Sequence, residues 1–290
     1  MFIKNRCNSS IISKDLIHCA DTVCTHRQNT MLSYTTYRND NSDTWVTFVH
    51  GAGGSSSVWF KQVREFKKHF NILLLDLRGH GDSKPDFDDE TINKYTFDSL
   101  TNDIVEVIDH EKIGKSHFIG ISLGTILIRN LAEKFPERVQ SMVLGGAVMN
   151  LNFRWKVLMT IGRTFKSIVP HLWIYRMFFF AIMPYSNHRE SRRLLIREAR
   201  KLYQKEFLRW FKLSSEVNPL LRFFRRKDIT IPTLYVMGGE DYLFLPTVKK
   251  LVQKSTSASL LLIEHCGHVV NVEESQLFNN LVIGYVSEPQ

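Results

Sequence analysis

Three residues whose types could together support nucleophilic catalysis are spread along the chain. Ser122, Asp241 and His268 occur in this order, each just beyond a run of apolar residues. A serine hydroxyl is a weak nucleophile at neutral pH, and it needs a general base that is in turn oriented by a carboxylate. The chain order nucleophile, acid, base is one in which such triads occur. We therefore predict that Ser122 is the nucleophile, Asp241 the orienting acid and His268 the general base.

The segment Gly120–Gly124 (GISLG) is predicted to form the turn that presents the serine. An apolar run precedes it, and a run with helical spacing follows it. On such a strand-to-helix turn, the side chains two positions before and two after the nucleophile must be small, because larger ones would clash. Gly120 and Gly124 meet this condition. The amino end of the following helix would favour negative charge that develops near Ser122.

A glycine-rich segment, residues 50–54 (HGAGG), follows the apolar run that ends at Val49. Acyl transfer needs two backbone N–H donors to stabilise the oxyanion that forms on the substrate. We expect one donor to be the N–H of Leu123, directly after the nucleophile. The other is expected to be the N–H of Ala52, since the glycines around it let the loop turn its amides toward a ligand.

Two neighbouring residues are alternatives to the predicted acid and base. Glu240 immediately precedes Asp241, and His265 lies three residues before His268. Both segments follow a strand-like run, so they are expected at the carboxyl edge of the sheet, where such groups should lie. Gly267 gives the backbone beside His268 extra freedom, which favours this histidine as the base.

Strand-like and helix-like segments alternate along most of the chain, which is typical of a mostly parallel sheet covered by helices on both faces. The predicted strands are Leu32–Tyr37, Thr44–Val49, Asn71–Leu77, Lys115–Ile121, Val139–Leu144, Thr233–Met237 and Ser259–Ile263. The predicted helices are Val58–His69, Phe97–His110, Leu123–Phe135, Pro246–Gln253 and Val270–Tyr285. The first of these helices is expected to bury one face, made of Val58, Phe60, Val63 and Phe66.

The alternation stops between about Met149 and Asp228, where the sequence has helical character and is rich in aromatic and basic residues. We interpret this segment as a cap inserted into the sheet domain. Most of its apolar residues are expected to pack against that domain, and the surplus could line a pocket for an acyl chain or an aromatic ester. The aromatic residues concerned include Trp155, Trp173, Tyr175, Phe178, Phe179, Phe180, Trp210 and Phe211.

Five motifs occur in an order that resembles the α/β-hydrolase superfamily. They are HGAGG (50–54), DLRGHGDS (76–83), GISLG (120–124), GGED (238–241) and GHVVNVEE (267–274). The chain is similar to the capped, serine-nucleophile members of the superfamily, its esterase- and lipase-like branch. The resemblance implies an α/β fold with an eight-stranded, mostly parallel sheet flanked by helices and an inserted helical cap. It also implies an acyl-enzyme on Ser122, with no metal and no organic cofactor.

The predicted organisation has three parts. Residues 1–30 are expected to be a disordered or non-native extension, residues 31–148 and 230–290 the hydrolase core, and residues 149–229 the helical cap. The predicted reaction is the hydrolysis of carboxylic esters that carry a hydrophobic moiety. Thioester hydrolysis, carbon–carbon bond hydrolysis and a lyase reaction on the same triad remain alternatives. So does a signalling protein of the hydrolase fold that binds a small molecule.

The charge of the chain is unevenly distributed. The formal net charge is +9, yet residues 151–230 hold 18 Lys and Arg against 5 Asp and Glu. Such a basic segment is compatible with a solvated helical surface, or with contact to an anionic lipid surface or an anionic substrate. No nucleic-acid-binding motif accompanies the charge, so nucleic acid is not expected as a partner. Cys266 is the only cysteine after residue 30, which predicts no disulfide framework and favours a cytoplasmic location.

Overall fold

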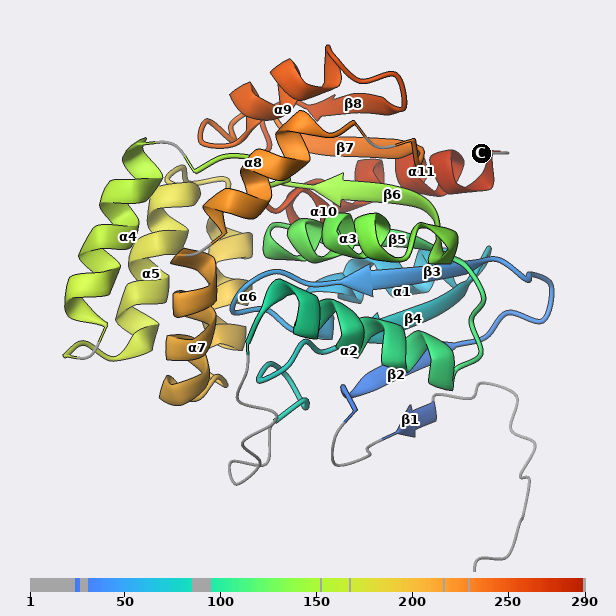
Figure 1. Cartoon of the computed structure of the whole chain (residues 1–290), viewed down its shortest axis with the longest axis horizontal. Coiled ribbons are helices and arrows are strands. Elements are labelled where there is room, and N and C mark those ends of the chain that lie inside the picture. Colours follow the sequence, from blue (N-terminus) through green and yellow to red (C-terminus); the bar gives the residue numbers. More distant parts are fainter. Residues whose placement is uncertain are drawn as a thin grey trace, which may run out of the picture.

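The structure is a computed structural model that describes residues 24–26, 31–84, 95–151, 153–166, 168–215, 217–228 and 230–288. Within these ranges the chain forms one eight-stranded sheet with helices on both faces (Figure 1). The predicted N-terminal extension lies outside the described residues, apart from the backbone of Cys24–His26, which pairs with the next strand at the edge of the sheet.

The sheet confirms the predicted fold class. Its strands are β1 (Cys24–His26), β2 (Tyr34–Tyr37), β3 (Trp45–Val49), β4 (Asn71–Leu75), β5 (Ser116–Ile121), β6 (Val139–Gly145), β7 (Thr233–Gly238) and β8 (Ala258–Ile263). Their order in the sheet is β1-β2-β4-β3-β5-β6-β7-β8. The pairs β1–β2 and β2–β4 are antiparallel, and the remaining neighbouring pairs are parallel. Every residue of β4, β5 and β7 is buried, as expected for strands covered on both faces.

Helices cover both faces of the sheet. They are α1 (Phe60–Phe66), α2 (Phe97–His110), α3 (Leu123–Lys134), α9 (Leu245–Val252), α10 (Val270–Glu273) and α11 (Ser275–Ser287), with short 3-10 helices η1 (Ser56–Trp59) and η3 (Pro136–Arg138). Helices α2 and α3 pack side by side on one face, and α1 and α11 on the other (Figure 1). Helix α2 buries one apolar face, which includes Leu100, Ile104, Val107 and Ile108.

Two helical predictions need correction. The expected helix Val58–His69 begins instead as the 3-10 turn η1, and Phe60, predicted to be buried, is 52% exposed. Because a 3-10 turn has three residues per turn, it shifts the phase of the helix that follows. Gln62 is buried there and donates through Nε2 to the Asn271 carbonyl oxygen and to Asn279 Oδ1. The predicted last helix is divided at Glu274 into α10 and α11.

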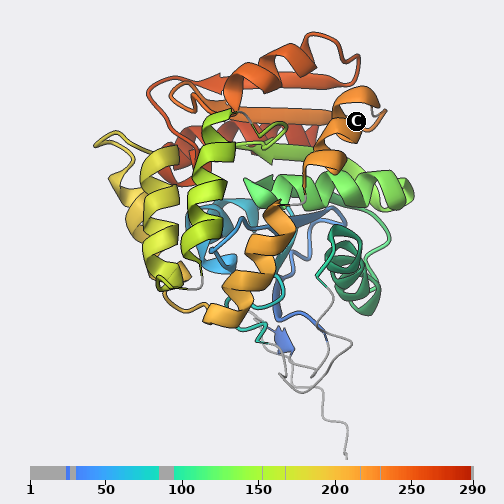
Figure 2. The same cartoon turned by 60° about the vertical axis from the view of Figure 1, so that its left-hand side comes forward.

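The described residues between β6 and β7 form five helices and no strand. They are α4 (Phe153–Phe165), α5 (His171–Ile182), α6 (Arg189–Ala199), α7 (Gln204–Ser215) and α8 (Asn218–Arg226). Strands β3 and β6 point toward α4–α7, so these four helices lie over the carboxyl edge of the sheet (Figures 1 and 2). None of the described helices combines the length and apolar character needed to cross a membrane.

Candidate active site

The turn at Ser122 has the strained geometry predicted for a nucleophile. Ser122 joins β5 to α3 with φ 54° and ψ −120°, a left-handed conformation that a residue with a side chain rarely adopts. A methyl group on Gly124 would lie 2.4 Å from the Val49 carbonyl oxygen, and one on Gly120 would lie 2.5 Å from Ile128 Cδ1. Backbone oxygens therefore leave no room for a side chain at Gly124, whereas at Gly120 the Ile128 side chain would have to shift.

The three predicted triad residues meet at hydrogen-bond distance. His268 Nε2 lies 2.9 Å from Ser122 Oγ, and His268 Nδ1 lies 2.8 Å from Asp241 Oδ2. With the carboxylate accepting from Nδ1–H, Nε2 is left as an acceptor for the serine hydroxyl. Asp241 is fully buried, and its other oxygen accepts from the Phe244 N–H at 3.2 Å. This arrangement can remove the serine proton and hold the imidazole in one orientation.

The alternatives to Asp241 and His268 have other positions. Glu240 points away from the triad, and its Oε2 accepts from Asn187 Nδ2 and lies 2.8 Å from His188 Nε2. The hydrogen bond from Asn187 is the main reason that the pKa of Glu240 is lowered. His265 is exposed and occupies a left-handed turn with φ 54°. Neither residue has a recorded hydrogen bond to the triad.

The glycine-rich loop, residues 50–54, lies directly against the turn at Ser122. A methyl group on Gly51 would be 3.0 Å from Ser122 Cβ and 3.6 Å from the Leu123 backbone nitrogen. Leu123 is the first residue of α3, where backbone N–H groups have no partner within the helix. Gly51 and Ala52 line the same pocket as Ser122 and His268. The glycine-rich loop therefore lies against Ser122 and the first residue of α3, and the roles of Ala52 and Leu123 as oxyanion donors stay a prediction.

Two buried histidines hold this loop, and the sequence analysis missed them. His50 Nε2 accepts from the Leu77 N–H at 2.9 Å, and His80 Nε2 accepts from the Gly53 N–H at 3.0 Å. Each ring directs Nδ1 to a backbone carbonyl oxygen, that of Gly51 and that of Arg78 respectively. Burial lowers the pKa of His50 and lowers that of His80 to about 3. Both rings are therefore neutral, which lets one nitrogen accept while the other donates.

The DLRGHGDS segment (76–83) contacts the residues that follow the glycine-rich loop. Asp76 accepts from the backbone N–H of Ser56 at 2.7 Å through Oδ1 and from that of Asp82 at 2.9 Å through Oδ2. A methyl group on Gly81 would lie 2.0 Å from Asp76 Oδ2. The motif thus ties the turn after β4 to the residues after the glycine-rich loop.

A buried polar cluster around His188 joins helix α6 to the loop that carries His268. His188, which precedes α6, is fully buried, and its Nε2 lies 2.8 Å from Glu240 Oε2 and 3.8 Å from Glu273 Oε2. Glu273 Oε2 accepts from the Gly267 N–H at 2.6 Å, one residue before His268. His188 therefore links helix α6 to the two loops that carry Asp241 and His268. No sequence motif marks His188, because its partners are far away along the chain.

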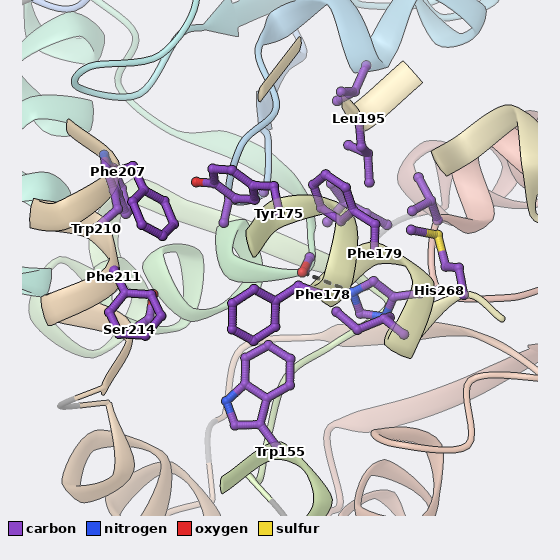
Figure 3. Close-up of a pocket in the computed structure, with 18 of the residues that line it drawn as sticks. Trp155, Tyr175, Phe178, Phe179, Leu195, Phe207, Trp210, Phe211, Ser214 and His268 are labelled. Atoms are coloured by element: carbon purple, nitrogen blue, oxygen red, sulfur yellow. Dashed lines mark hydrogen bonds between the residues drawn. The ribbon is translucent and has the colours of Figure 1, made fainter. Parts of the chain in front are cut away.

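An apolar pocket opens onto Ser122 and His268 (Figure 3). Aromatic side chains from α4, α5 and α7 form most of its wall, including Trp155, Tyr175, Phe178, Phe179, Phe207, Trp210 and Phe211. The rings of Trp155 and Phe178 lie 5.5 Å apart, and those of Tyr175 and Phe179 are stacked at 5.5 Å. Burial raises the pKa of the Tyr175 hydroxyl, so this group stays protonated. The pocket suits an apolar substituent beside a carbonyl carbon at Ser122.

Comparison with known proteins agrees with these observations. The family model of the alpha/beta hydrolase fold matches residues 44–165. The chain is 23% identical to 3-oxoadipate enol-lactonase 2 of Acinetobacter baylyi, over 92% of this chain and 96% of that protein. It is 25% identical to a putative carbamate hydrolase, RutD, of Stutzerimonas stutzeri, over 82% of this chain and 89% of that protein.

Solved structures share the same architecture. A hydrolase from Pseudomonas aeruginosa superposes with a TM-score of 0.74 at 21% identity, covering 92% of this chain and 98% of that one. The order of the strands, the serine turn after β5 and these matches lead to one conclusion. The chain has the alpha/beta hydrolase fold and is an enzyme.

Proposed function

We propose that the protein is a serine hydrolase that cleaves carboxylic esters with a hydrophobic moiety. The observation that supports it most directly is the continuous hydrogen-bonded chain from Asp241 through His268 to Ser122 at the floor of an aromatic pocket. The relatives named above include an enol-lactonase and a putative carbamate hydrolase, whose substrates, as named, also contain an acyl carbon bonded to oxygen.

The reaction proceeds in two halves. Ser122 Oγ attacks the ester carbonyl carbon while its proton passes to His268 Nε2, and the N–H groups of Ala52 and Leu123 stabilise the oxyanion. The imidazolium, paired with Asp241, then gives its proton to the departing alcohol, which leaves an acyl-enzyme. A water molecule attacks the acyl carbon and transfers its proton to His268, and Ser122 regains a proton as the acid is released.

The test is turnover of p-nitrophenyl esters of increasing acyl length by the wild type and by Ser122→Ala, with labelling by a fluorophosphonate probe in the same samples. The proposal predicts that turnover and labelling are both lost in Ser122→Ala while its thermal unfolding is unchanged. Thr125→Ala is a control, since this neighbouring hydroxyl donates to the Ser122 carbonyl oxygen and takes no part in the proposed chemistry. Retained ester hydrolysis in Ser122→Ala would exclude the mechanism.

A further inference from the structure

The outermost helix of the molecule exposes an apolar face. Phe153, Val157, Ile161 and Phe165 recur every four residues along α4, and all four are exposed, with Phe153 79% accessible. The opposite side of α4 buries Met159 and packs Gly162 against Phe178 and Phe211. Helix α4 therefore has its packing face turned inward and a second apolar face turned to solvent.

Exposed apolar residues also occur before and along the next helix. Ile168, before α5, is 79% exposed, and Trp173 and Phe180, seven residues apart on α5, are 63% and 53% exposed. Helices α4 and α5 lie side by side at the end of the molecule toward which β3 and β6 point (Figures 1 and 2). We call these seven residues the α4–α5 face. Contiguous exposed apolar side chains on a folded protein mark an interaction surface.

The segment that carries the α4–α5 face has charged residues of one sign only. No aspartate or glutamate occurs between Glu137 and Glu190. Over the same stretch the described basic side chains on α4, α5 and their connection are Lys156, Arg163, Lys166 and Arg176. The Arg176 guanidinium lies 5.7 Å from the centroid of the Trp173 ring, so cation and aromatic ring are neighbours. Aromatic and aliphatic residues framed by cations are typical of segments that lie in the interface of an anionic membrane.

We propose that the α4–α5 face docks onto the surface of an anionic lipid bilayer. Aliphatic residues such as Val157 and Ile161 have no role in binding nucleic acid phosphates, whereas they gain free energy when they enter the acyl region. Two copies of this face would bring like charges together, which opposes self-association. The inner sides of the same helices supply Trp155, Met159 and Phe178 to the pocket, so docking places the pocket beside lipid.

The experiment measures binding of the purified protein to phosphatidylcholine vesicles with and without phosphatidylserine by co-sedimentation. The wild type is expected to bind the anionic vesicles more tightly, and salt should weaken the difference. Lys156→Gln with Arg163→Gln should lower the affinity for anionic vesicles roughly 25-fold, since each cation near the surface contributes about fivefold. Trp173→Ser with Phe153→Ser should lower affinity for both vesicle types by at least about tenfold.

Phe223→Ser is the matched control, because Phe223 is 46% exposed on α8, outside the face. It should bind vesicles as the wild type does. Phe223→Ser and the two double variants should hydrolyse a water-soluble ester at the wild-type rate. Vesicle binding is also measured with Ser122→Ala, which separates docking from the proposed chemistry. A wild type that stays in the supernatant with anionic vesicles would overturn the proposal. So would unchanged binding by both double variants, or a dimer in solution that Trp173→Ser abolishes.

Discussion

Replacement of Asp241 by asparagine tests how the histidine is activated. Asp241 is fully buried, and its Oδ2 lies 2.8 Å from His268 Nδ1. In Asp241→Asn the amide oxygen can keep the hydrogen bond from the Phe244 N–H, now made by Oδ1, so that the amide nitrogen faces His268. The histidine must then accept at Nδ1 and carry its proton on Nε2, where it can no longer take the proton of Ser122.

The size of the effect follows from the lost charge pair. In the transition state an imidazolium would lie about 4 Å from the carboxylate, and two unit charges at this distance interact by about 4 kcal/mol at an effective dielectric constant of 20. This free energy corresponds to a loss of about 10³-fold in rate. The unfavourable tautomer adds to it, and a loss of about 10⁴-fold is known for the same change in a serine protease triad. We expect kcat to fall by about 10³- to 10⁴-fold.

The assay is kcat on a p-nitrophenyl ester, measured together with the rate of fluorophosphonate labelling. Glu240→Gln is the matched control, since Glu240 is adjacent in sequence yet bonds to Asn187 and His188 rather than to the triad. Urea unfolding should show that both variants remain folded. A loss below tenfold in Asp241→Asn, or an equal loss in Glu240→Gln, would refute the assignment of Asp241 as the orienting acid.

Three further predictions concern stability. Gly124→Ala should lower the unfolding free energy by at least about 3 kcal/mol, because the added methyl group meets backbone oxygens. Gly284→Ala in helix α11 should raise it by up to about 1 kcal/mol, since nothing lies within 4 Å of the added methyl group. Equal urea unfolding of the two variants would contradict the close approach at Gly124. Burial lowers the pKa of His117 from its usual 6.5 to about 4, so the unfolded chain binds its proton first as the pH falls. The contribution of neutral His117 to the unfolding free energy should be fully present above pH about 6.5 and decrease toward pH about 4, with about 2 kcal/mol lost at pH 5. In the same unfolding assay, His117→Gln should lose less unfolding free energy than the wild type between pH 7.5 and pH 5. His188→Ala should lower the unfolding free energy by about 1–3 kcal/mol, because Glu240 and Glu273 lose their buried partner. It should also speed proteolysis between β6 and β7. An unchanged cleavage rate would show that the contacts of His188 do not hold α6 against the core.

Much of the fold was predictable because each element carries its own pattern. Helix α2 has the predicted bounds, Phe97–His110, since its apolar residues recur with helical spacing and Thr96 supplies an N-cap. Strand β4 was predictable from its apolar run Ile72–Leu75, since both faces of the strand are covered. The prediction was wrong at Phe60, where a local 3-10 turn changed which side of the helix faces inward.

The sequence by itself determined the order of the strands and helices along the chain outside residues 149–229. It also singled out Ser122, Asp241 and His268, with Glu240 and His265 as alternatives. These follow from spacing and from the glycines that a sharp turn requires, which are local properties. Only the tertiary structure decided that Asp241 rather than Glu240 reaches His268, and that His80 holds the loop of Ala52. It also decided which aromatic residues of α4 and α5 line the pocket and which face solvent. These outcomes depend on which segments meet after folding, and residues that meet in this way share no pattern along the chain.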